Sequence, residues 1–250
     1  MRARFGAVEA LMKVKTYAST QLQLEHLMDM LRLCRGDNMG VRDLVPSIML
    51  RLNRDQECYD FIKWYCTAGQ AGDYDWGDMD LGFLDVKNAD VFESVSYLER
   101  RHIISLPHAA CIVLLKIKLF LDFTSLETSF SLSKNVPPEI LGNIQGHVVR
   151  SLIIANNEDI MSRTSHVETI AKLKAQIGTM YDVVHKQNAF FWPALLDPVY
   201  HLNSRPGSYS LGSEAEMQLS LKWCYDSWAE TPGAIEFIKA KMAGMKSKSK

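Results

Sequence analysis

The sequence lacks the short motifs that mark common catalytic sites. No H-E-x-x-H, P-loop, G-x-S-x-G or G-x-G-x-x-G pattern occurs in its 250 residues. The seven histidines are scattered along the chain, without the spacing of a metal-binding motif. The sequence therefore predicts no catalytic residue, no metal site and no cofactor.

Paired cysteines are also missing. The chain has five cysteines, an odd number, and no two of them have C-x-x-C spacing. Most lie among apolar residues of predicted helices, a pattern typical of reduced, buried thiols in an intracellular protein. The N-terminus shows no signal peptide, so we expect a cytoplasmic or nuclear location.

The sequence has neither a strong charge of one sign nor a long apolar run. Its 28 basic and 29 acidic residues give a formal net charge of -1, which favours neither nucleic acid nor an anionic membrane as partner. Only the tail, residues 245–250, is basic. The most apolar segment, 109–123, contains Lys116, Lys118 and Asp122 and is too short to span a bilayer. We expect a core helix there, with both lysines reaching solvent through their aliphatic stems.

What is present is helical periodicity, and it is clearest between Leu24 and Cys66. Apolar residues recur there at three- and four-residue spacing in three groups separated by short polar turns. Each group forms a wide apolar stripe, so each helix needs a neighbour to cover it. Pro46 fits only in a first turn, which places a helix start near Asp43 or a kink at the proline. The groups are Leu24, Leu27, Met28, Leu31 and Cys34; Val41, Leu44, Val45, Ile48, Met49 and Leu52; and Cys58, Phe61, Ile62 and Tyr65.

An earlier helix around Phe5 extends this pattern into two helical pairs, Arg4–Cys34 and Val41–Ala68. Equivalent positions are offset by about 34 to 36 residues, the period of tetratricopeptide (TPR) hairpins. The usual consensus tryptophan and glycine positions are missing. We predict an all-α fold of antiparallel helical hairpins stacked as a TPR-like α-solenoid, with residues 1–68 as its first part.

Residues 69–94 break the helical pattern with a run rich in glycine and aspartate. The spacing from Asp73 fails as an EF-hand, because Gly77 comes one position early and Leu84 stands at the twelfth position. We predict a long acidic loop that is held by its own aromatic residues and binds no specific divalent ion.

A C-terminal helical region, residues 95–244, is expected to pack on the first. Its predicted helices cover 90–101 and 107–123, begin near Pro138, Ser165 and Ser213, and end with one that starts at Pro232. Residues 124–135 are expected to be a Ser/Thr-rich linker, and 189–212 an irregular aromatic segment that caps the helical stack.

Several phrases resemble the helical region of fungal proteins that carry a MYND-type zinc finger elsewhere. They are MLRLCRGDNMGVRDLVPSIMLRLNRDQECYDFIKWY, FFWPALLDP, MQLSLKWCYDSW and ETPGAIEFI. The resemblance covers most of the chain and implies an intracellular helical module. The closely spaced cysteines and histidine of the finger itself are absent, so neither its zinc nor its partner-binding role carries over.

Two functional hypotheses follow. The first is a scaffold that mediates protein–protein interaction, with a protein or peptide partner in a concave surface between helical pairs. The residues expected to bind that partner are Arg51, Arg54, Gln56, Lys63, Trp64 and Trp76. The alternative is an enzyme, or the regulatory subunit of one, that uses either the acidic loop or the region of His185, His201 and Cys224.

Overall fold

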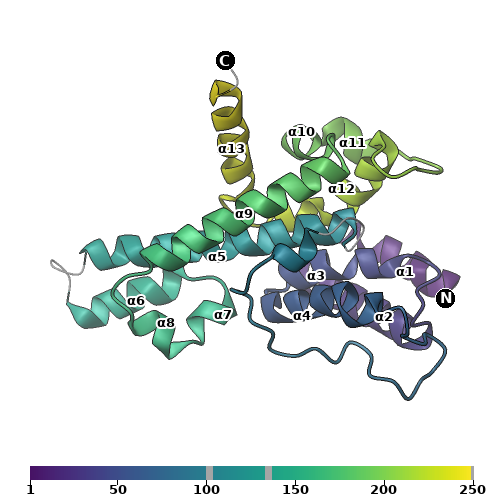
Figure 1. Ribbon diagram of the computed structural model, residues 1–250, viewed down its shortest axis with the longest axis horizontal. Helices are drawn as coiled ribbons and strands as arrows, with labels where there is room; N and C mark the ends of the chain where they lie inside the picture. The colour runs from purple at the N-terminus through teal and green to yellow at the C-terminus, as the bar shows by residue number, and fades with distance from the viewer. Residues whose placement is uncertain (100–103, 133–136, 249–250) are drawn as a thin grey trace.

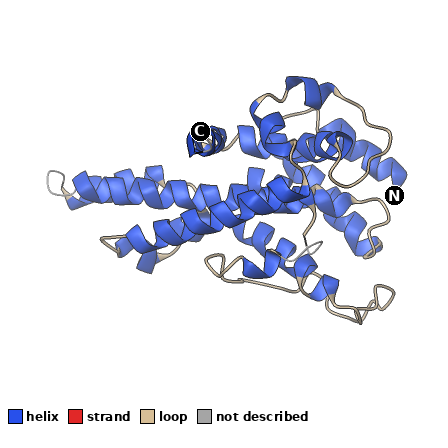
Figure 2. Ribbon diagram, turned by 45° about the horizontal axis from the view of Figure 1, so that its top comes forward, coloured by secondary structure: helices blue, strands red, loops and turns tan. Residues whose placement is uncertain are grey.

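The structure is a computed structural model, and it describes residues 1–99, 104–132 and 137–248. Those residues form α-helices and loops and contain no strand, so the prediction of an all-α fold is confirmed (Figure 2). In chain order the helices are α1 Arg2–Leu11, α2 Tyr17–Leu33, α3 Val45–Arg51, α4 Asp55–Cys66, α5 Leu106–Leu132, α6 Pro138–Val148, α7 Leu152–Ala155, α8 Glu158–Ser162, α9 Val167–Gln187, α10 Phe191–Leu196, α11 Val199–Asn203, α12 Glu214–Ala229 and α13 Ala234–Lys248.

The turns of the first four helices follow from the sequence. Both carboxylate oxygens of Asp37 accept backbone N–H groups, from Val41 and Arg42, each at 2.9 Å. Pro46 lies in the first turn of α3, so the predicted start near Asp43 is correct and no kink is needed. The successive pairs α1 and α2, α2 and α3, and α3 and α4 are each in contact.

Helix α5 is the centre of the molecule. Every residue of α5 from Leu106 to Leu119 is buried, and the helix contacts α3 and α4 from the earlier part of the chain and α6, α9, α12 and α13 from the later part. Figure 1 shows α5 and α9 running alongside each other as the two longest helices. The described part of the C-terminal region therefore packs on the first four helices around one shared core.

The predicted linker at 124–135 is wrong over its described part, because α5 continues to Leu132. The hydroxyls of Thr124 and Thr128 bond back to carbonyls four residues earlier, at 2.7 and 2.8 Å, so they remain compatible with a helix. Leu126 is fully buried and anchors this extension. Residues 133–135 lie outside the described residues.

Two further expectations need correction. The helix predicted over 90–101 is replaced, in its described part, by turns and one 3₁₀ turn at Ser96–Leu98, since Asp90 and Ser94 each bind the backbone N–H two residues ahead. Residues 100 and 101 lie outside the described part. The segment 189–212 is more regular than expected, because α10 and α11 fall within it.

Neither lysine of α5 reaches solvent, contrary to the prediction. Lys116 is fully buried and donates to the carbonyl of Val91, and Lys118 donates to the Asp55 carboxylate at 2.6 Å. The reason is that every residue of α5 from Leu106 to Leu119 is buried, so each ammonium has an internal acceptor instead.

Candidate functional site

The loop at 69–94 lies against α4. It contains Trp76 and covers Trp64, two of the predicted partner-binding residues. Trp64 of α4 is fully buried, and its indole N–H donates to Asp85 of the loop at 2.9 Å. The Trp76 ring lies 5.9 Å from the Trp64 ring and 4.9 Å from the Tyr74 ring. Trp64 is thus a core residue, and its prediction as an exposed anchor is wrong because the loop covers it.

The charged and polar residues of the predicted face have partners within the chain. Arg51 binds Glu230 through two nitrogens at 2.7 and 2.8 Å, Arg54 pairs with Glu57, and Lys63 pairs with Glu93 at 2.6 Å. Gln56 donates to Asp60 and to the carbonyl of Ala89. Of these four residues, Arg54 and Gln56 line one open groove beside Tyr17. The Arg51 side chain, 8 % exposed, faces α12 instead.

The residues behind the enzyme alternative do not meet in a pocket. Cys224 is fully buried, and burial raises the pKa of its thiol to about 12, whereas His185 is exposed at the surface. Asp75 and Asp78 of the acidic loop accept backbone N–H groups of that same loop. Within the described residues no three His, Cys, Asp or Glu side chains are placed to share a metal ion.

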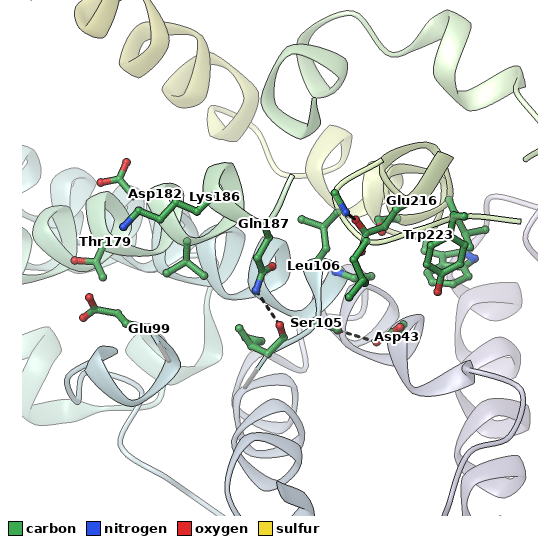
Figure 3. A pocket seen from close by; sticks show the side chains of 18 residues that line it. Asp43, Glu99, Ser105, Leu106, Thr179, Asp182, Lys186, Gln187, Glu216 and Trp223 are labelled. Atoms are coloured by element: carbon green, nitrogen blue, oxygen red, sulfur yellow. Dashed lines mark hydrogen bonds between the residues drawn. The ribbon is translucent and has the colours of Figure 1, made fainter. Parts of the chain in front are cut away.

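A cavity of about 710 Å³ has a lining of both apolar and charged side chains (Figure 3). It lies where the start of α5, the C-terminal half of α9, α12 and the loop before α12 meet. This volume falls within the range typical of ligand pockets. We call it the α5/α9/α12 cavity.

Hydrogen bonds between distant segments fix its floor. Ser105 donates to Asp43 at 2.8 Å, and Gln187 donates to the carbonyl of Ile104 at 2.9 Å. The buried His108 ring nitrogen lies 3.0 Å from the carbonyl of Arg42 and 3.5 Å from the Asp43 carboxylate. Burial lowers the pKa of His108, which favours a neutral imidazole beside Asp43.

The edge formed by residues 209–212 depends on one tight turn. Gly212 has φ of 78°, in the left-handed region that favours glycine, and its N–H donates to Glu216 at 2.7 Å. The same carboxylate oxygen accepts from Asn188 at 3.0 Å. Ser213 accepts the N–H of Glu216, which confirms the predicted helix start. The turn leaves Tyr209 and Leu211 at the cavity edge, 52 % and 74 % exposed.

One end of the cavity carries three charged groups, those of Glu99, Asp182 and Lys186. Figure 3 shows Glu99, Thr179, Asp182 and Lys186 together, with Leu106 and Trp223 toward the other end. Neither Glu99 nor Asp182 forms an ion pair with any residue the structure describes. Asp43 and Glu216 lie toward the end with Trp223, and Lys186 is the one cation among the described lining residues.

Comparison with protein-family models, curated proteins and solved structures found no match. Within its described residues the chain forms no helix with the length and apolarity required to cross a membrane.

The α5/α9/α12 cavity was not predictable from short-range sequence patterns. Its lining residues are separated by up to 180 positions, from Asp43 to Trp223, and belong to no common motif.

Proposed function

We propose that this chain is a helical protein-interaction module that binds a partner peptide in the α5/α9/α12 cavity. The partner segment carries an apolar side chain next to a lysine or arginine. The observation that carries this proposal is the pairing of an exposed apolar edge, Tyr209 and Leu211, with an acidic end, Glu99 and Asp182.

The apolar edge supports recognition of an apolar side chain. Leu211 leaves most of its surface in water, and covering such surface contributes roughly 25 cal/mol per Å². Trp223 and Leu106 extend this apolar lining into the cavity. Aromatic residues in such positions are frequent anchors of interfaces.

The acidic end of the cavity supports recognition of a basic residue next to the apolar side chain of the partner. Glu99 and Asp182 are exposed and lie across the cavity end from each other, with only Lys186 as a nearby cation among the described residues. A lysine or arginine of the partner would make charge-assisted hydrogen bonds with these carboxylates. Charge complementarity of this kind adds specificity and speeds association.

We also propose that α1 to α4 form a two-unit TPR-like array and that the chain is related to the helical regions of MYND-containing fungal proteins. The successive contacts α1 with α2, α2 with α3 and α3 with α4 support the first proposal. The all-α fold supports the second, and the unpaired thiols support an intracellular location for the module.

A random peptide library displayed on phage tests the binding site. Selected peptides should share an apolar residue beside a lysine or arginine. Their affinity, measured by fluorescence anisotropy, should fall at least about 10-fold in the double variant Glu99→Lys/Asp182→Lys and in Leu211→Asp. Glu168→Lys and Leu33→Asp are the matched controls, because both residues are exposed and lie outside the cavity. Selected peptides that bind all variants equally, or peptides with no basic residue, would refute the proposal.

A further inference from the structure

The last helix, α13, stands out from the body of the molecule (Figure 1). Its first half is packed on α5, where the rings of Phe237 and Phe120 lie 5.3 Å apart, and Met242 still packs against the core. Residues 243–245 are exposed. The helix continues to Lys248, about 9 Å beyond Met242 at the usual rise per residue. The C-terminal end of α13 therefore extends beyond the part that packs on the core.

This end of α13 carries the two kinds of side chain that the proposed partner segment requires. We call residues 243–250 the basic segment. It contains no acidic residue, and its charged residues are Lys246, Lys248 and Lys250. Met245, directly before the first of these lysines, is 45 % exposed. The basic segment thus places an apolar side chain beside a lysine, which matches the apolar edge and the acidic end of the α5/α9/α12 cavity.

The base of α13 is fixed to a different face of α9 from the face that lines the cavity. The Lys241 ammonium lies 4.8 Å from the centroid of the Tyr181 ring. Thr179, Asp182 and Lys186 of the same helix line the cavity instead. From this base α13 leads away from α9, as Figures 1 and 2 show. A second copy of the chain can bring its basic segment to the cavity without any change in α13.

We propose that the partner of the α5/α9/α12 cavity is a second copy of this chain, whose basic segment enters the cavity. Met245 of that copy packs against the apolar edge at Leu211. Its Lys246 pairs with Glu99 and Asp182 at the acidic end. This inference rests on the proposed function, because it names the partner of the same site. Since the contact joins two different surfaces, the copies associate head to tail.

Sedimentation velocity of the full chain tests the proposal. The sedimentation coefficient should rise with protein concentration at low salt, and it should fall back as salt is added, because salt screens the ion pairs. The cavity variant Glu99→Lys/Asp182→Lys and the segment variant Lys246→Glu/Lys248→Glu should each stay monomeric and melt like the wild type. A wild type that stays monomeric at every concentration would overturn the proposal.

Two further samples separate a specific contact from a general effect of charge. Lys13→Glu/Lys87→Glu changes the net charge as the segment variant does, but both lysines are exposed and lie outside α13 and the cavity. This control should associate like the wild type. An equimolar mixture of the cavity variant and the segment variant should also associate, because it holds one intact basic segment and one intact cavity. A monomeric mixture, or equal effects of the control and the segment variant, would contradict the proposal.

A fluorescent synthetic peptide of residues 243–250 distinguishes this inference from the proposed function. It should bind the segment variant, whose cavity is intact, and bind the cavity variant at least about 10-fold more weakly in fluorescence anisotropy. Met245→Ser in the peptide should weaken binding to the same degree, since it removes the apolar side chain. If library-selected peptides bind the cavity and this peptide does not, the second copy is not the partner and the proposed function stands. If neither binds, both fail.

Discussion

Lys118 and Asp55 form an ion pair with a nitrogen–oxygen distance of 2.6 Å, and their side chains are 7 % and 1 % exposed. Ser151 donates to the other carboxylate oxygen of Asp55 at 2.8 Å. The ammonium also lies within 3.3 Å of the carbonyl of Leu50. This pair joins α4, α5 and the segment before α7 inside the core.

Removing one partner of this pair should therefore destabilise the protein strongly. Lys118→Met leaves the Asp55 carboxylate buried without its cation, and we expect a loss of about 3–5 kcal/mol in urea unfolding. Lys63→Met is the control, because the pair of Lys63 with Glu93 is partly exposed and should contribute about 1 kcal/mol or less. Similar losses for both variants would show that burial does not increase the contribution of the Lys118–Asp55 pair to the free energy of unfolding.

The apolar faces of α2 and α4 should be equally sensitive to truncation. Leu31 is fully buried and Phe61 is 4 % exposed, so Leu31→Ala and Phe61→Ala should each cost about 2–5 kcal/mol. Leu33 lies two residues from Leu31 on α2 but is 56 % exposed, and Leu33→Ala should change the free energy of unfolding by less than about 0.5 kcal/mol. Losses below about 1 kcal/mol for both core variants would show that these helices pack differently.

Lys116 should give the folded protein a distinctive dependence on pH. Burial lowers its pKa from 10.5 to about 8, so the folded state releases this proton before the unfolded state does. The stability of the wild type relative to Lys116→Met should then rise between pH 8 and 10.5, by up to about 3 kcal/mol. Below pH 8 the penalty for the buried charge is fully present and the difference should be flat.

The comparison with Lys116→Met is needed because other groups titrate in the same range. Burial raises the pKa of the Cys66 and Cys224 thiols to about 12, which lowers stability as the unfolded thiols ionise. Both proteins share this effect, so it cancels in the difference. A difference that stays constant from about pH 7 to about pH 10 would contradict the assignment to Lys116.

Arg35 should control the order of the acidic loop. Its guanidinium donates to the carbonyls of Asp78, Met79 and Leu81, at 3.0, 2.9 and 2.9 Å. Arg35→Gln should therefore speed thermolysin cleavage within 69–94 at least about 10-fold while the core melts nearly unchanged. Arg32→Gln should cleave like the wild type, since the partner of Arg32 among the described residues is Asp29 of its own helix. Equal cleavage of the two variants would refute this role.

The sequence predicted well those features that depend on neighbouring residues. The position of Pro46 in a first turn and the helix start at Ser213 both follow from local hydrogen bonding and backbone geometry. The start of α6 at Pro138 and a long helix near Ser165, which begins at Val167, are also confirmed.

Features that depend on distant residues were missed. Arginine and tryptophan are typical of binding surfaces, so Arg51 and Trp64 were predicted to bind a partner. Their actual hydrogen-bond partners lie elsewhere in the chain: Glu230 is 179 positions from Arg51, and Asp85 is 21 positions from Trp64. Lys118 similarly finds its partner 63 positions away. No local pattern reveals such pairings, and the α5/α9/α12 cavity is assembled from the same kind of long-range contact.

The place of α5 in the chain has a consequence for synthesis of the protein. This 27-residue helix is made before α9, α12 and α13, which cover much of its surface. During synthesis the growing polypeptide therefore exposes the apolar surface of α5. That surface stays uncovered until α9, α12 and α13 have left the ribosome. Transiently exposed apolar surface of this kind promotes aggregation and binds chaperones. Premature termination before residue 214 should therefore yield insoluble, chaperone-bound fragments rather than a smaller folded protein.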